Sequence, residues 1–90
     1  MQVFYSVENL SVRYWAWCVK LHRKENVIHY YNNLTQTENC LICNNKTEAT
    51  EIYTILHKGV SATKLISIFD RCGFNGFELY VYFMQNGIIE

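Results

Sequence analysis

Two cysteines, Cys40 and Cys43, stand at a spacing that metal sites use. A C-x-x-C turn lets two thiolates reach one zinc ion, but a closed site takes four ligands. The chain offers no second paired motif, only the single residues Cys18, Cys72, His29 and His57. Leu41 and Ile42, between the two thiols, are apolar and suit burial. The pattern therefore favours free thiols packed as small hydrophobes, with zinc at Cys40 and Cys43 as the alternative.

The sequence contains no recognisable combination of catalytic residues. Glu48, Glu51 and Asp70 stand where helix surface and helix capping explain them, and His57 has no nucleophile nearby. No pair of carboxylates follows strand ends as metal-dependent hydrolysis would require. The sequence predicts a protein that is not an enzyme and that needs no cofactor.

Aromatic residues are the other unusual feature of the chain, at 16% of its residues. If the strands expected below bury one face, the opposite face would gather side chains of the kind that protein interfaces favour. We expect the partner-binding residues to be Tyr14, Tyr30, Tyr31, Tyr80, Tyr82 and Met84. The alternative interpretation is a ladder of tyrosines that only stabilises the sheet.

The charge balance weakens a role in binding nucleic acid. Eight Lys and Arg are matched by eight Asp and Glu, so the formal net charge is zero, whereas proteins that bind phosphates usually carry a basic surplus. Nucleic-acid contacts, if made, would come from Lys20, Arg23, Lys24 and Lys64. The first three stand at one turn, for which a solvated hairpin tip is the favoured interpretation.

Two helices are predicted between Asn45 and Gly73. Asn45 and Ser61 are good N-caps, and apolar residues recur every three or four positions in both segments. Gly59 and Gly73 follow the two apolar stripes, as helix ends prefer. Helices of about three turns need tertiary packing, so both stripes must be covered by the rest of the chain.

Strands are predicted on both sides of this helix pair. Residues 2–7, 13–21 and 27–31 have strong strand character, and residues 13–31 are expected to form a hairpin. Residues 32–44 are interpreted as a loop with one short strand at most, and residues 77–84 alternate as a last strand. We therefore expect one α+β domain over residues 1–90, in the order β-β-β-α-α-β. Its three to four antiparallel strands would carry a helical hairpin on one face.

The helix pair resembles, loosely, the helix-turn-helix of DNA-binding regulators, with Gly59 in the turn and Val60, Leu65 and Ile68 at apolar positions. This resemblance implies a nucleic-acid-binding regulator that uses the helix pair or the aromatic sheet face. Lys58, however, stands where that motif expects an apolar residue, and few exposed side chains could read bases.

The favoured interpretation is a non-enzymatic module that binds another protein, either a host enzyme or its own copy. In type, though not in motif, the small chain rich in Asn, Ile and Tyr is similar to virus- or mobile-element-encoded inhibitors of host defence enzymes, such as anti-CRISPR proteins. No apolar run is long enough to cross a membrane and no export signal is present, so a cytoplasmic location is expected.

Overall fold

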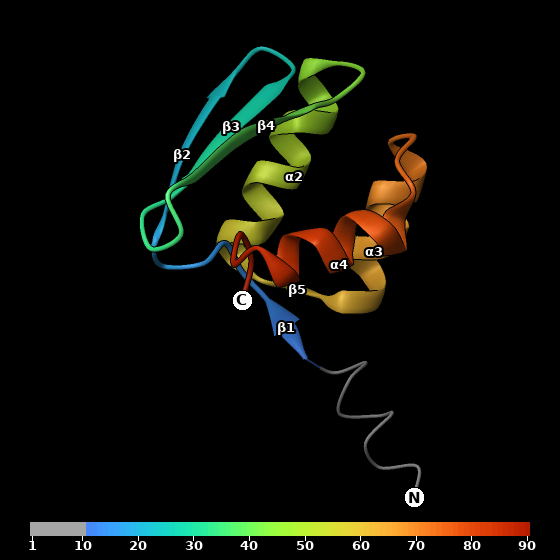
Figure 1. Cartoon of the computed structure of the whole chain (residues 1–90). Helices are drawn as coiled ribbons and strands as arrows, with labels where there is room; N and C mark the ends of the chain where they lie inside the picture. The colour runs from blue at the N-terminus through green and yellow to red at the C-terminus, as the bar shows by residue number, and fades with distance from the viewer. Residues whose placement is uncertain (1–10) are drawn as a thin grey trace, which may run out of the picture.

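The computed structural model describes residues 11–90, so the strand predicted at residues 2–7 lies outside the described residues. Five strands and three helices follow one another along this part of the chain (Figure 1). In order they are β1 (Val12–Arg13), β2 (Val19–Lys24), β3 (Val27–Asn32), β4 (Thr37–Ile42), α2 (Lys46–Lys58), β5 (Val60–Ser61), α3 (Ala62–Arg71) and α4 (Gly76–Gln85). The prediction of an α+β domain with a three-stranded antiparallel sheet is confirmed.

The main sheet is an antiparallel meander in the order β2-β3-β4. The predicted hairpin is present, since β2 and β3 pair along their whole length across a turn at Glu25 and Asn26. Glu25 adopts a positive φ of 54°, and the Asn26 side chain donates to the carbonyl of Cys43 at 2.8 Å. The short strand allowed within residues 32–44 is β4, and it pairs with the other side of β3.

The two predicted helices are present, and each begins directly after its predicted N-cap residue, Asn45 or Ser61. The Asn45 side chain accepts a hydrogen bond from the amide of Glu48 at 2.9 Å, and that of Ser61 accepts one from the amide of Lys64 at 3.2 Å. Gly59 ends α2 with φ 105°, a conformation that only glycine adopts without strain. Between the helices, β5 pairs with β1 and ties the start of the described chain to the helical part.

The last predicted strand is wrong, because residues 77–84 form helix α4. The Asn75 side chain caps the helix by accepting from the amide of Glu78 at 3.2 Å. The amide of Gly76 donates to the Asp70 carboxylate at 2.7 Å, and a Cβ at Gly76 would lie 2.3 Å from the backbone oxygen of Ile66. The absence of a side chain at this position therefore lets α4 begin directly against α3.

The predicted strand at residues 13–21 is also interrupted. Trp15 forms only an isolated bridge to Ile89, and the chain then turns before β2 begins. The turn is closed by the amide of Val19, which donates to the carbonyl of Ala16 at 3.1 Å. Trp15 is consequently buried and Trp17 exposed, whereas an uninterrupted strand over residues 13–21 would place both on one face.

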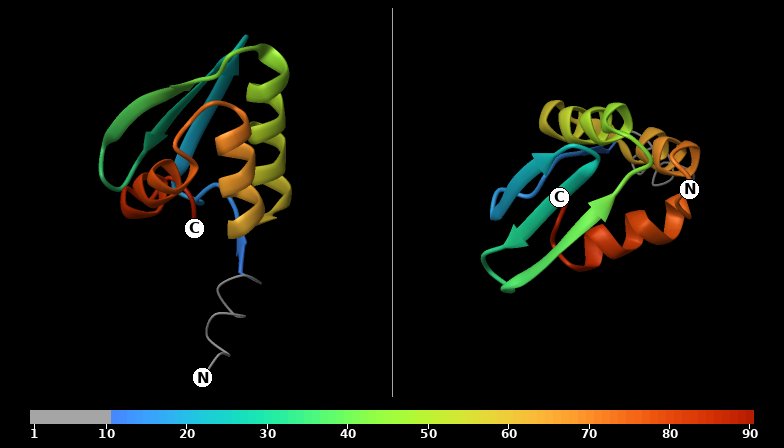
Figure 2. Two further views of the ribbon diagram at one scale, coloured as in Figure 1. Left: turned by 90° about the vertical axis from the view of Figure 1, so that its right-hand side faces the viewer. Right: turned by 90° about the horizontal axis from the view of Figure 1, so that it is seen from above.

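Helices α2 and α4 lie against one face of the main sheet, and α3 packs against α4 (Figure 2). Phe83 of α4 is at the centre of this core. It contacts Trp15, Tyr30 and Phe69, with ring centroids at 6.2, 5.5 and 5.8 Å. No element among residues 11–90 covers the opposite face of the sheet, where Lys20, His22 and His29 are exposed.

Candidate interaction surface

The structure does not bring the six predicted partner-binding residues onto one surface. Tyr30 and Tyr80 are buried, at 4% and 7% exposure, and Tyr31 and Met84 are half-buried. Only Tyr14 and Tyr82 are substantially exposed. The predicted aromatic sheet face is therefore wrong. It required residues 77–84 to be a strand, whereas the helical period turns Tyr80 inward and Tyr82 outward.

The two buried tyrosines have internal roles. The Tyr80 hydroxyl accepts a hydrogen bond from Nε of Arg13 at 2.9 Å. Tyr30 lies on the helix-facing side of β3, where burial and the neighbouring Tyr82 hydroxyl raise its pKa. Both rings belong to the core and are not available to a partner.

Cys40 and Cys43 do not share one site. Cys40 is half-buried on the outer side of β4, whereas Cys43, three residues on, is buried. Because successive strand residues alternate, an odd separation places two side chains on opposite faces. Burial, the nearby Cys72 and Glu48 raise the pKa of the Cys43 thiol to about 11, which favours the neutral form. Within residues 11–90, no three potential ligands stand ready to hold a metal ion.

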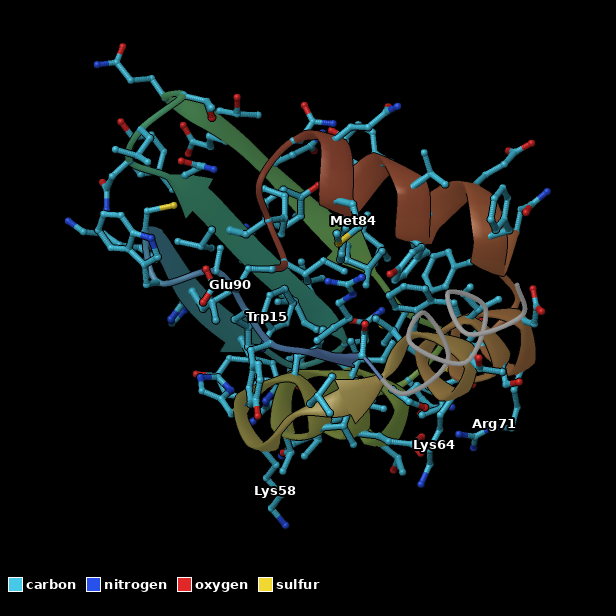
Figure 3. All side chains as sticks on the ribbon, turned by 90° about the horizontal axis from the view of Figure 1, so that it is seen from below. Trp15, Lys58, Lys64, Arg71, Met84 and Glu90 are labelled. Atoms are coloured by element: carbon cyan, nitrogen blue, oxygen red, sulfur yellow. The ribbon has the colours of Figure 1, made fainter. Side chains whose placement is uncertain are left out.

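The predicted nucleic-acid contacts are divided between two sides of the molecule. Lys20 and Lys24 are exposed on the outer face of β2, but Arg23 alternates to the other face and donates to the carbonyl of Glu25 at 3.0 Å. Lys64 lies on α3, where it points outward on the same side as Lys58 and Arg71 (Figure 3). The four residues therefore do not form one basic surface.

The most exposed large apolar side chain among the described residues is Trp17, at 78%. Leu34, in the turn between β3 and β4, is 68% exposed. The backbone amide and the side-chain amide of Asn33 both donate to the carbonyl of Cys18, at 3.0 and 3.1 Å. These two bonds continue the β2-β3 pairing by one step and place the turns that carry Trp17 and Leu34 side by side (Figure 1). We call Trp17 and Leu34 the turn patch.

Asn32, buried at 2% exposure, fixes the turn that carries Leu34. Its side-chain oxygen accepts from the amides of Leu34 and Thr35 at 2.8 and 3.2 Å. Its side-chain nitrogen donates to the carbonyls of Asn86 and Gly87 at 3.2 and 2.9 Å. The turn is thus held against the end of α4, and its backbone is arranged before any partner arrives.

Sequence reasoning missed the turn patch because it assigned Trp17 to a strand and residues 33–36 to an undefined loop. The signal that could have found it is the cluster of turn-forming residues Asn32 and Asn33 directly before Leu34. For Trp17, the decisive turn at Trp17 and Cys18 has no glycine, proline or asparagine to mark it.

Comparisons with known proteins add no functional information: neither a family model, nor a curated protein, nor a solved structure matches the chain. Among residues 11–90, no helix has the length and apolar character needed to cross a bilayer.

Proposed function

We propose that this protein is a non-enzymatic module that binds another protein through the turn patch. The supporting observation is the 78% exposure of Trp17 on a turn whose neighbours are fixed by hydrogen bonds. Tryptophan is enriched among the few residues that carry most of the energy of protein interfaces. Because the backbone that carries it is already ordered, binding through this side chain costs little backbone conformational entropy.

The turn patch requires little rearrangement to bind. Asn32 and Asn33 satisfy the backbone of the turn around Leu34 internally, so a partner does not have to order it. The amide of Val19 closes the other turn. This arrangement matches the general form of a binding site in which a rigid scaffold presents loops.

The proposal is tested by capturing partners with the tagged chain and its variants Trp17→Ala and Leu34→Ala. We expect both variants to keep the far-ultraviolet circular dichroism of the native fold and to lose partners that the native chain retains. Phe77→Ala is the matched control, because Phe77 is similarly exposed, at 64%, on α4. Folded variants that retain every partner of the native chain would contradict the proposal.

Binding to the protein's own copy is one form of this function. Size-exclusion chromatography with light scattering over a range of concentrations would detect it. If the turn patch forms the contact, Trp17→Ala shifts the mass toward the monomer and Phe77→Ala leaves it unchanged.

A nucleic-acid-binding regulator is the second candidate, supported by the exposed Lys20 and Lys24 on the outer face of β2. Binding through phosphate contacts weakens steeply between low and physiological salt, whereas an apolar contact through Trp17 responds little. Titration of labelled single- and double-stranded oligonucleotides at two salt concentrations separates the candidates. Steep salt dependence that Lys20→Gln and Lys24→Gln reduce would favour the second.

The narrower expectation, an inhibitor of a host defence enzyme encoded by a virus or mobile element, stays a proposal, as does the cytoplasmic location. A partner captured through Trp17 would test the first directly, because inhibition can be assayed with the captured enzyme and the purified chain. The four free cysteines fit a reducing compartment.

A further inference from the structure

The outer edge of β2 carries main-chain hydrogen-bonding groups that no strand among residues 11–90 pairs with. β2 is the outermost strand of the main sheet, and β3 is its only neighbour there (Figure 1). The amide of Asn33 donates to the carbonyl of Cys18 at 3.0 Å, one step beyond the paired strands. Because hydrogen-bonded and non-hydrogen-bonded pairs alternate in an antiparallel ladder, every second residue from Cys18 onward bonds to β3. The amides and carbonyls of Leu21 and Arg23 therefore face the free edge.

Basic side chains line this edge on the uncovered face of the sheet. Lys20, His22 and Lys24 are exposed at every second position of β2. Within residues 11–90 the one ion pair joins Arg71 to Glu51, so no described carboxylate pairs with either lysine of β2. Lysines on an edge strand repel another strand of like charge, including β2 of a second copy. The edge of β2 therefore favours a strand of opposite charge.

The other edge of the main sheet, on β4, is less suited to such a strand. The amide of Cys43 donates to the carbonyl of Asn26 at 2.8 Å, so alternation directs the main-chain groups of Cys40 and Glu38 outward. The amide of Cys40 is already bound by the side-chain oxygen of Asn39 at 2.8 Å. The exposed carboxylate of Glu38 repels an acidic strand. Charge and free main-chain groups together favour the edge of β2.

We propose that the outer edge of β2 binds an extended acidic segment of a partner protein by main-chain pairing. The proposal names the chemistry of the partner, and it rests on the proposed function in taking that partner to be a protein. Addition of a strand to an exposed sheet edge gains affinity from main-chain hydrogen bonds and specificity from alternate side chains. Trp17 precedes the first residue of β2, Val19, by two positions, so the edge leads directly to the turn patch.

The register of β2 sets which side chains of the acidic segment contribute to binding. In antiparallel pairing with the segment, Lys20, His22 and Lys24 would occupy the non-hydrogen-bonded pairs, where opposing side chains are closest. Carboxylates at every second position of the segment would oppose these three residues. The positions between them would oppose the half-buried Leu21, where β-branched side chains fit a pleated surface. A nucleic acid offers phosphates to the lysines but no main chain to the edge.

The proposal is tested with the full-length chain and a labelled peptide in which glutamate alternates with threonine, using fluorescence anisotropy. Methylation of the threonine amides, which would point toward β2, keeps the charge of the peptide but removes the main-chain hydrogen bonds. We expect this change to weaken binding roughly tenfold or more. Methylation of the glutamate amides, which would point away from β2, is the matched control and should leave binding unchanged.

Substitutions in the chain test the role of charge. Lys20→Gln and Lys24→Gln should each weaken binding of the peptide roughly two- to fivefold, because each removes an opposite-charge pair. Lys64→Gln is the matched control, since Lys64 is exposed on α3 and should not change binding. Circular dichroism verifies that each variant is folded. The amides of Leu21 and Arg23 should also become protected from hydrogen exchange when the peptide binds.

The proposal is overturned if the unmodified peptide does not bind, if methylation at the threonines has no effect, or if a single-stranded oligonucleotide of equal charge binds more tightly. These outcomes differ from failure of the turn patch. Loss of captured partners in Trp17→Ala, without binding of the peptide, would overturn the edge proposal and support the turn patch. Binding of the peptide at Leu21 and Arg23, with capture unaffected by Trp17→Ala, would support the edge and contradict the turn patch.

Discussion

At the scale of single residues, Gly59 and Asn32 stabilise this fold by connecting segments that are distant in the sequence. Gly59 joins α2 to β5 with a positive φ, and the side chains of Tyr14 and Val12 lie over its Cα. Asn32 joins three segments through four hydrogen bonds and has no unsatisfied atom. Both residues are polar or small, but each connects elements distant in sequence.

Gly59→Ala should lower the free energy of unfolding by about 1 to 3 kcal/mol through backbone strain and displacement of the Tyr14 ring. An added Cβ would lie 2.6 Å from Cε2 of Tyr14 and 2.8 Å from Cγ1 of Val12. Gly73→Ala, also at positive φ but with its nearest neighbour atom 3.6 Å away, measures strain alone. In urea titrations the loss should be larger at Gly59 and should shrink in a Tyr14→Ala background.

Asn32→Ala should lower the free energy of unfolding by about 2 to 3 kcal/mol, because it removes four hydrogen bonds around a buried site. Asn39→Ala is the control, since Asn39 is exposed and, among the contacts described, its side chain only accepts a hydrogen bond from the amide of Cys40. A similar small loss for both variants would show that the Asn32 bonds add little. Leu34 should also become more mobile in Asn32→Ala, which amide hydrogen exchange would detect.

At the scale of elements, helix α4 is where the sequence pattern and the structure disagree most, because the pattern predicts a strand and the structure has a helix. Its apolar and aromatic residues occur on every side, so period two and period 3.6 fit almost equally well. The N-cap at Asn75 and the contact of Gly76 with α3 favour the helix. The buried positions Gly76, Tyr80 and Phe83 then follow the helical period.

Tyr80→Ala should lower the free energy of unfolding by about 3 kcal/mol, because it empties a buried site and frees the Arg13 side chain. Phe77→Ala should change it by less than about 0.5 kcal/mol, since this ring is exposed. A strand over the same residues predicts the reverse order, with Phe77 inside. Urea titrations of the two variants therefore distinguish helix from strand.

At the scale of the whole molecule, the single core lies between one face of the sheet and the helices. It includes the buried thiols of Cys43 and Cys72, whose pKa values are both raised, chiefly by burial. When the pKa of a thiol is higher in the folded state than in the unfolded state, the free energy of unfolding depends on pH. Cys43 comes directly after β4 and Cys72 directly after α3, so the two thiols join the sheet and the helices in one core, and their ionisation affects the stability of the whole domain.

The stability of the domain should therefore fall in alkaline solution. The pKa of Cys43 is raised to about 11, so above the ordinary thiol range the unfolded chain loses this proton first. The contribution is fully present below about pH 8.5 and decreases by at most about 1.4 kcal/mol per pH unit until the folded thiol ionises. Urea titrations at pH 7, 8.5 and 10 with reductant would measure it. Equal pH dependence in the native chain and in Cys43→Ala would contradict this assignment.

The sequence by itself determined the two capped helices, the β2-β3 hairpin and the fold class. Asn45, Ser61 and Gly59 act within one helical turn, so their signals do not depend on the rest of the chain.

Only the tertiary structure decided which aromatic side chains are covered. Residues 77–84 are apolar on all sides, and their local pattern cannot choose between a strand and a helix. Packing against α3 and the sheet decides for the helix. It buries Tyr80 and Phe83 and leaves Tyr82 partly exposed. Trp17 is exposed for a similar reason, since the turn that carries it is closed by backbone hydrogen bonds that no local residue type encodes.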